Sequence, residues 1–332
     1  MSKKTNSNAN FLLRLDQEKV VFFTSAFMFI IFSIFLDRFF TYENIINLVR
    51  NISVLGLLSL GMAIVVIGRG VDLAIVAVMA VSMTLAIILA KTGYAFHTAL
   101  FISLLFAIFA GALSGCLVAY GEISPIFATI AMLSIIYGLG SGYITTLMVN
   151  YVPEDVYWFS YIGNEKILTI PISIWIFALA ALLIHLLLKS TGIGKYFYAV
   201  GDNLEAARIT GIPVRPVLVG QYIISSIMAF LAGFVTAASV GSMNIRMSTS
   251  TIIYDVLLVV VLGGIGLSGG RGGVRNVLVG AILIGLLLNG MTIMDINYTV
   301  QNLLKSSVLL AALVVNAVLN PRDEQTSQQG DI

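Results

Sequence analysis

The sequence predicts an all-α, polytopic helical membrane protein, and three observations support this fold class. The chain has 332 residues, of which 59% are hydrophobic and only 10% are charged. Soluble domains carry about 25% charged residues, so this chain has too few to cover a water-facing surface. Its apolar residues form long runs bounded by charge, glycine or proline, sufficient for about ten spans of about 20 residues. Its basic residues are concentrated in alternate loops.

Ten apolar runs are expected to cross the bilayer as helices. The first run follows a polar segment and lacks a small-residue cleavage site, which indicates an uncleaved span rather than a signal peptide. Membrane helices tolerate the glycines and prolines in several runs because neighbouring helices satisfy the freed backbone groups. The expected spans are 20–36, 52–67, 73–90, 98–120, 125–145, 168–188, 217–239, 253–267, 276–294 and 302–319.

The distribution of basic residues predicts the orientation of the chain. With the N-terminus inside, the cytoplasmic segments hold twelve of the 18 Lys and Arg residues, and the outer segments hold six. This excess favours a cytoplasmic location for both termini. The expected organisation is a cytoplasmic N-terminal segment (1–19), a transmembrane domain (20–319) that includes a long cytoplasmic loop (189–216), and a cytoplasmic tail (320–332).

The outer loop at about 146–167 is expected to carry an interfacial helix. Pro153 is followed by Glu154 and Asp155, and proline at a first helical position with acids in the first turn is a helix-start signal. The aromatic residues that follow suit a helix lying at the level of the lipid headgroups. These aromatic residues are Tyr157, Trp158, Phe159 and Tyr161.

The glycine-rich stretch "LGGIGLSGGRGG" at 262–273 contains G-x-G-x-x-G, but its context excludes a dinucleotide site. The preceding "IIYDVLLVVV" continues a membrane span, and no acidic residue follows about 20 positions later. Glycines instead allow close approach of membrane helices and a sharply turned helix end. The predicted packing or hinge residues are Gly263, Gly264, Gly266, Gly269 and Gly270.

The inner loop at 189–216 is expected to contain a short capped helix at 202–211. Asp202 is the predicted N-cap, with Glu205 as its capping-box partner. Gly211 fits a left-handed stop, and Pro213 prevents continuation. A helix this short is unstable alone in water, so it rests on the membrane surface or docks a cytoplasmic protein. The "GIGK" at 192–195 lacks the spacing of a phosphate-binding loop.

Three ordered stretches resemble the signatures of ribose-type ATP-binding cassette (ABC) importer permeases, a group that includes sugar and autoinducer-2 permeases. They are "GRGVDLAIVAVMA" (68–80), "GKYFYAVGDNLEAARITGIPV" (194–214) and "VVVLGGIGLSGGRGG" (259–273). The resemblance covers about residues 50–320. It implies a subunit of the bacterial inner membrane that works with a second permease (in a homodimer or heterodimer), cytoplasmic ATPase subunits and a periplasmic solute-binding protein.

The resemblance also implies that 202–211 is the coupling helix received by the ATPase, and we refer to it as the coupling segment. Carried over by position, the residues expected to contact the ATPase are Gly201, Asp202, Asn203, Glu205, Ala206, Ala207 and Arg208.

This chain departs from the family pattern at two places. Arg69 stands between Gly68 and Gly70, where the family usually has adjacent glycines, and Ala74 replaces a serine. Before the glycine cluster, "YDVLLVVV" replaces a stretch that usually contains an acidic residue near an A-I-A-A run. These differences bear on the substrate rather than on the fold, and the solute need not be ribose.

Three ionisable residues in or near the spans are functional candidates because such residues are costly in a membrane. Asp72 is expected to pair locally with Arg69 at the cytoplasmic interface. Asp255 starts a span, where it caps the helix or lines a pathway. His185 is expected to be a structural residue at the interface rather than a proton relay.

The side chains available for chemistry are few. Two histidines and one cysteine leave no catalytic triad, metal cluster or paired carboxylates, so we expect no enzyme activity, cofactor or metal. Cys116 lies in an apolar run and is expected to be buried. A net charge of +2 does not suggest nucleic acid. The sequence thus predicts a lipid-embedded permease subunit for a sugar or sugar-like small polar solute, with an ion-coupled secondary carrier as the alternative.

Overall fold

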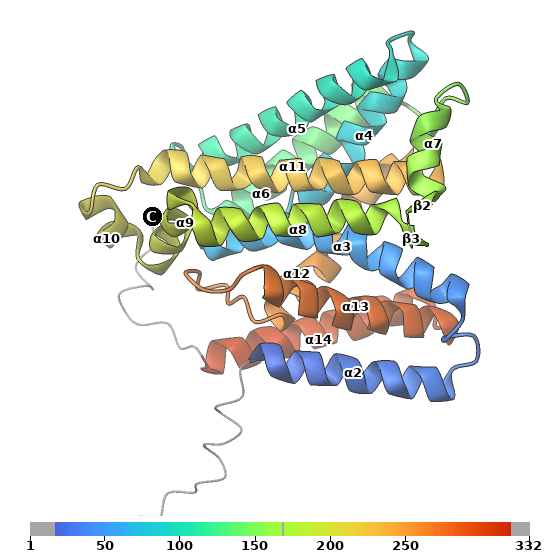
Figure 1. Ribbon diagram of the computed structural model, residues 1–332. Coiled ribbons are helices and arrows are strands. Elements are labelled where there is room, and N and C mark those ends of the chain that lie inside the picture. Colours follow the sequence, from blue (N-terminus) through green and yellow to red (C-terminus); the bar gives the residue numbers. More distant parts are fainter. Residues whose placement is uncertain (1–16, 168, 320–332) are drawn as a thin grey trace, which may run out of the picture.

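The computed structural model describes residues 17–167 and 169–319, which form one bundle of helices with a few short strands (Figure 1). Seven helical segments are long and apolar enough to cross a membrane, and three further apolar stretches are shorter: Ile75–Lys91, Ile252–Leu262 and Tyr298–Val314. This confirms a polytopic helical membrane protein. The predicted runs fall one each on these helices, whereas the number of crossings and the side of the termini stay predictions.

The seven long apolar segments are α2 (Gln17–Phe35), α3 (Tyr42–Ile67), α5 (Phe96–Ala119), α6 (Pro125–Leu139) together with the turn that extends it to Ile144, α8 (Ile172–Ser190), α11 (Val214–Val240) and α13 (Val274–Ile293). The three others are α4 (Ile75–Lys91), α12 (Ile252–Leu262) and α14 (Tyr298–Leu319). The smaller helices are α7 (Tyr157–Asn164), α9 (Gly192–Asp202), α10 (Leu204–Ile209), the π-helical turn η1 (Gly140–Ile144) and the 3₁₀ turn η2 (Ile245–Thr249). Two antiparallel strand pairs complete the described fold: β1 (Val149–Tyr151) with β4 (Ser242–Asn244), and β2 (Lys166–Ile167) with β3 (Ile170–Pro171).

The core of the bundle is the second half of α3, the first half of α4 and the helices that pack on them. Nearly every residue from Leu55 to Ile67 and from Ala74 to Met83 is buried. α11 contacts α3, α4 and α5, and small residues bring these helices together. A Cβ at Gly111 would lie 2.6 Å from the backbone oxygen of Tyr222, and one at Gly233 would lie 2.6 Å from that of Met79. Glycine thus allows the close packing expected between membrane helices.

Two predicted span edges are wrong because local capping decides where the helices begin and end. α3 begins at Tyr42 rather than 52, since the Thr41 hydroxyl accepts a hydrogen bond from the backbone N–H of Asn44 at 3.4 Å. α12 ends at Leu262 rather than 267. Gly264, with φ +97°, turns the chain in a conformation that L side chains rarely adopt.

The outer-loop helix exists, but it begins later than predicted. Pro153 to Val156 forms a turn closed by the Val156 N–H on the Pro153 carbonyl at 3.2 Å, and α7 starts at Tyr157. Tyr157 and Tyr161 are exposed, as expected of headgroup-level residues, whereas Phe159 is fully buried. Its ring packs edge to face on Phe96 and Phe234, at centroid distances of 4.8 and 5.0 Å.

Cys116 is exposed, so the prediction of a buried thiol is wrong. The buried face of α5 carries Ala107, Gly111 and Ser114, with Gly115 beside them. Cys116 falls on the opposite side of the helix, which faces away from α11 and α4. An apolar run reports hydrophobicity but does not say which helix face meets protein and which meets lipid.

The two ends of the bundle differ in structure. α9 and α10 lie at one end, together with the loop between α12 and α13, while α7, β2 and β3 lie at the other (Figure 1). The chain therefore brings its second and third signature stretches to one end of the molecule.

Candidate coupling site

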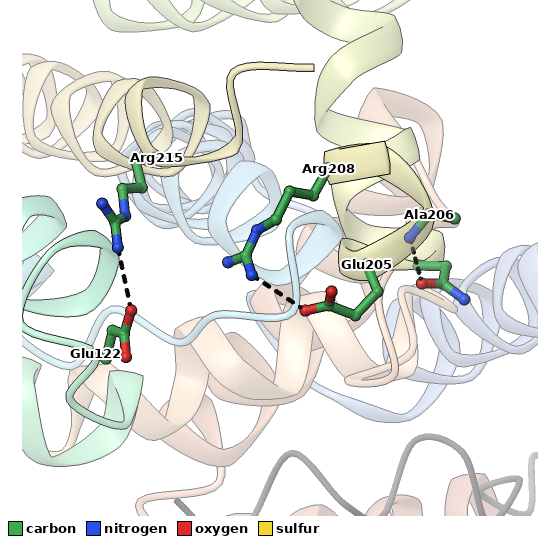
Figure 2. Close-up of polar contacts among 6 residues, drawn as sticks. Glu122, Glu205, Ala206, Arg208 and Arg215 are labelled. Carbon is green, nitrogen blue, oxygen red and sulfur yellow. Dashed lines mark hydrogen bonds and ion pairs between the residues drawn. The ribbon is translucent and has the colours of Figure 1, made fainter. Parts of the chain in front are cut away.

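The predicted coupling segment is the end of one helix followed by a second, shorter helix. α9 begins after Thr191, whose hydroxyl accepts a hydrogen bond from the Gly194 N–H at 3.1 Å. α10 begins after Asn203, whose Oδ1 accepts a hydrogen bond from the Ala206 N–H at 2.9 Å (Figure 2). Asp202 is the last residue of α9. The prediction that it caps the second helix is therefore wrong, and Asn203 is the cap.

Glu205 does not complete a capping box. Its Oε1 lies 3.4 Å from a terminal guanidinium nitrogen of Arg208, and both side chains are exposed (Figure 2). The predicted stop is confirmed, because Gly211 has φ +82°. The N–H of Ile212 then closes the turn on the carbonyl of Ala207 at 3.1 Å, as expected of a left-handed helix end.

The tip of the coupling segment is exposed, while its base is buried. Ile209 is 84% exposed, although it is a large apolar residue. Ala207 is only 3% exposed and holds α10 against its neighbours α9 and α11. Of the predicted contact residues, Asp202, Asn203, Glu205, Ala206 and Arg208 are exposed, whereas Gly201 and Ala207 are buried.

All three signature stretches meet at one place, which we call the junction: Ile67, Arg69, Gly201, Asp202, Ser268 and Gly270. Nε of Arg69 donates hydrogen bonds to the carbonyls of Gly201 at 2.6 Å and Ser268 at 2.9 Å, and a terminal nitrogen donates to the carbonyl of Asp202. The Gly270 N–H donates to the Ile67 carbonyl at 2.8 Å. The end of α9 is thereby joined to the end of α3 and to the glycine-rich stretch.

Close approach explains Gly201, Gly269 and Gly270. A Cβ at Gly201 would clash with the Ile67 carbonyl, and one at Gly269 would clash with the side chain of Arg69. Gly269 and Gly270 also have φ of +78° and +71°, which favour glycine. These glycines therefore satisfy backbone and packing requirements at the junction.

The remaining predicted glycines shape the loop at 263–273, which we call the glycine loop. The Gly263 carbonyl accepts a hydrogen bond from the Asn276 amide at 2.7 Å, and a Cβ at Gly263 would clash with the backbone of Asn276. The Gly266 carbonyl accepts from the Gly269 N–H at 3.1 Å. Gly264 makes the turn that ends α12. A hinge role for these positions stays a prediction.

Tyr198 ties the glycine loop to α9 at a second point. Its hydroxyl donates a hydrogen bond to the Gly272 carbonyl at 2.7 Å. Partial burial raises the pKa of this hydroxyl above its ordinary value, which favours the protonated, donating form. His185 and Lys189 line a surface cavity beside Tyr198, and the structural role expected of His185 stays a prediction.

The predicted pair between Arg69 and Asp72 is wrong. Arg69 turns to the backbone carbonyls of the junction, and Asp72 is buried in the bundle. Asp72 accepts hydrogen bonds from the Ser225 hydroxyl at 2.7 Å and from the Ala74 N–H at 3.1 Å. Spacing of i and i+3 brings side chains together only within a helix, and residues 68–74 lie between α3 and α4.

Asp255 pairs with Lys305, a partner that the sequence did not indicate. Nζ of Lys305 lies 2.9 Å from Oδ1 of Asp255, and their side chains are only 4% and 9% exposed. α12 has no side-chain N-cap, so the capping role proposed for Asp255 is wrong. The pair joins α12 to α14. The sequence signal for this pair is one charge of opposite sign in each of two apolar runs. It does not identify the partners, because they are 50 residues apart.

The coupling segment presents exposed charged and apolar side chains at one end of the bundle. Within residues 17–167 and 169–319, no group of three or more His, Cys, Asp or Glu side chains could hold a metal ion. The described fold is that of a polytopic helical membrane protein with a short, exposed, capped helix at one end.

Comparison with known proteins agrees with this class. The model of the branched-chain amino acid transport system permease component family matches residues 44–316, and the chain belongs to this family. It is 29% identical to the ribose import permease of Haemophilus influenzae over 321 residues, covering 96% of this chain and 98% of that protein. No solved structure matches the chain significantly.

Two other relatives show the same class over most of the chain. The ribose import permease of Bacillus subtilis is 32% identical over 292 residues, covering 86% of this chain and 88% of that protein. The galactofuranose transporter permease of Escherichia coli is 29% identical over 274 residues, covering 82% and 79%. The predicted resemblance to sugar ABC permeases is therefore confirmed.

Family membership settles the biochemical class. The chain is a multi-pass permease subunit of an ABC importer in the bacterial inner membrane, and not an enzyme. A permease of this kind works with an ATPase and a solute-binding protein. The comparisons do not support the ion-coupled carrier that the sequence analysis kept as an alternative.

Proposed function

We propose that this permease imports a sugar or a sugar-like small polar solute. The relatives that cover most of the chain are named for ribose and galactofuranose, whereas the family description names branched-chain amino acids. The family model and these relatives cover similar shares of the chain, and we give more weight to the relatives because their names agree on a sugar.

The second part of the proposal is that the coupling segment docks the ATPase. The observation that carries it is the combination of an exposed tip and a buried base in a helix of only six residues. Such a helix has too few internal hydrogen bonds to be stable alone, and its base rests on α9 and α11. Its tip presents a charged pair and the apolar side chain of Ile209, which suit a partner surface with an apolar contact and a polar rim.

The proposed ATPase contacts are therefore of two kinds. The exposed residues would touch the ATPase directly, and the buried ones would hold the segment in place. Direct contact is assigned to Asp202, Asn203, Glu205, Ala206 and Arg208, and support to Gly201 and Ala207.

Transport then follows from movement of the coupling segment. ATP-driven closure of two ATPase subunits would move the segment on each of two permeases, which form a homodimer or a heterodimer in the lipid bilayer. The junction carries this movement to α3 and to the glycine loop. The solute-binding protein would deliver solute at the opposite end, near α7, and the coupling end would face the cytoplasm.

Uptake by the assembled importer tests the substrate class. The permease would be reconstituted in liposomes with its ATPase and its solute-binding protein, and ATP-dependent uptake of labelled ribose, galactofuranose, arabinose and leucine would be measured. We expect uptake of at least one sugar and none of leucine. Uptake of leucine alone would refute the sugar proposal, and uptake without the ATPase would refute the mechanism.

A further inference from the structure

We infer that Arg69 is a positioning residue that fastens the end of α9 and the glycine loop to the end of α3. The inference rests on the proposed function, because the fastened parts are those through which the coupling segment would act. Its partners are the carbonyls of Gly201, Asp202 and Ser268, which lie 132, 133 and 199 residues away along the chain. Arg69 is not among the residues predicted to contact the ATPase.

The chemistry of the site suits an arginine. Gly201 and Asp202 end α9, where backbone carbonyls have no partners within the helix and carry a partial negative charge. A guanidinium offers several N–H donors in one plane and no acceptor. Hydrogen bonds from a charged donor are about twice as strong as neutral ones. One arginine therefore satisfies the end of α9 and a loop carbonyl together.

The backbone of Arg69 adds a second, independent observation. Its φ is +67°, in the left-handed region that disfavours residues with a Cβ. Its N–H closes the end of α3 on the Val66 carbonyl at 2.9 Å, and glycine is the usual residue at such a position. A strained residue persists only where surrounding contacts hold it. Here those contacts are the three carbonyls that the side chain reaches.

The connection makes the coupling segment and the core move together. Arg69 follows Gly68, the C-cap of α3, and the turn after it leads to Asp72 and α4, which are buried in the bundle. If α10 is pushed, the end of α9 cannot slide past α3 without breaking the hydrogen bonds of Arg69. We therefore expect loss of Arg69 to separate ATP hydrolysis from solute movement, while the docking surface stays in place.

Hydrogen exchange on the purified permease tests the fastening without any partner. Arg69→Met removes the donors and keeps an unbranched side chain. We expect the amide of Gly270 and its neighbours in the glycine loop to exchange about tenfold faster, the effect of losing a few charge-assisted hydrogen bonds. The matched control is Arg38→Met, since Arg38 is exposed and also has a positive φ of 70°. The control should leave the glycine loop unchanged.

Coupling is then measured in the reconstituted importer. For Arg69→Met we expect the ratio of solute moved to ATP hydrolysed to fall about fivefold or more, while co-purification of the ATPase stays within about twofold. Arg69→Lys keeps the charge but lacks the planar fork, so its coupling ratio should lie between those of wild type and Arg69→Met. It replaces the Met variant in this test if that variant does not fold. Arg69→Gly, which relieves the backbone but removes the donors, should behave as Met.

The outcomes separate this inference from the proposed function. Unchanged exchange in the glycine loop would overturn the fastening. Faster exchange with a wild-type coupling ratio would overturn the positioning role. Failure of the wild-type permease to bind an ATPase would instead refute the proposed function. The exchange result would still test the fastening by Arg69, because that experiment uses the permease without a partner.

Discussion

Two ion pairs show how differently the bundle interior and the coupling segment are built. Lys305 and Asp255 lie 2.9 Å apart with side chains 4% and 9% exposed. Arg208 and Glu205 lie 3.4 Å apart with side chains 56% and 64% exposed. Water solvates each charge of the second pair, so neither charge depends on the other for its stability. The charges of the first pair are shielded from water, and besides Asp255 the Lys305 ammonium meets the ring of Tyr298, 5.9 Å from its centroid.

This difference shows which charged side chains can exchange their ion-pair partner at little cost. A surface pair contributes about 0–1 kcal/mol because water screens it and both side chains lose freedom. Its charges are free to turn to a second protein at little cost. In a buried pair, desolvation makes either charge expensive without the other. The interior pair therefore fixes α12 to α14, and the exposed pair leaves the charges of α10 open to the docking proposed above.

The largest expected effect comes from breaking the buried pair. Lys305→Met leaves Asp255 without its cation in the bundle, and we expect the free energy of unfolding to fall by about 3–5 kcal/mol. Thermal unfolding in detergent would measure it. The matched control is the double variant Lys305→Met with Asp255→Leu, which removes both charges and should recover most of the loss. A single variant as stable as wild type would show that the pair is not structural.

A smaller effect is expected at the base of the coupling segment. Gly201→Ala places a Cβ against the Ile67 carbonyl and 2.7 Å from the Gly270 nitrogen. Because α9 and α3 must separate to admit it, we expect the stability to fall by about 1–3 kcal/mol, as for other overpacked sites. Gly220→Ala in α11 is the matched control, since a Cβ there meets nothing within 4 Å. Equal stability of both variants would contradict the close packing of the junction.

These contacts mark the limit of what the sequence predicted. Composition and apolar runs predicted the bundle because burial of apolar surface needs no particular partner. The stop at Gly211 was predictable because it depends on local backbone geometry. The cap was not, since Asp202 and Asn203 are both good caps and α9 extends through the first of them. The bonds of Arg69 and the partner of Asp255 were missed because they join segments 50 to 199 residues apart.

The smallest effect on stability, and the sharpest test of the comparison, is expected at the exposed pair. Arg208→Glu puts two carboxylates on one exposed face of α10, and we expect the unfolding of the permease to change by no more than about 0.5 kcal/mol. Figure 2 shows a suitable control, Arg215→Glu, because Arg215 is also exposed and pairs with Glu122 at 3.2 Å just beyond the coupling segment.

Binding of the ATPase should separate these two variants. In the proposed complex, the tip of the coupling segment would be removed from water, so a reversed charge at 208 would cost about 2–5 kcal/mol where its partner group is buried. We therefore expect Arg208→Glu to insert normally in the membrane, to lose most ATPase on co-purification and to abolish uptake, whereas Arg215→Glu keeps both. Full association and wild-type uptake with Arg208→Glu would mean that position 208 remains in water in the complex. The docking contact would then rest on Ile209 and its neighbours, and the freedom of the exposed pair would have no role in coupling.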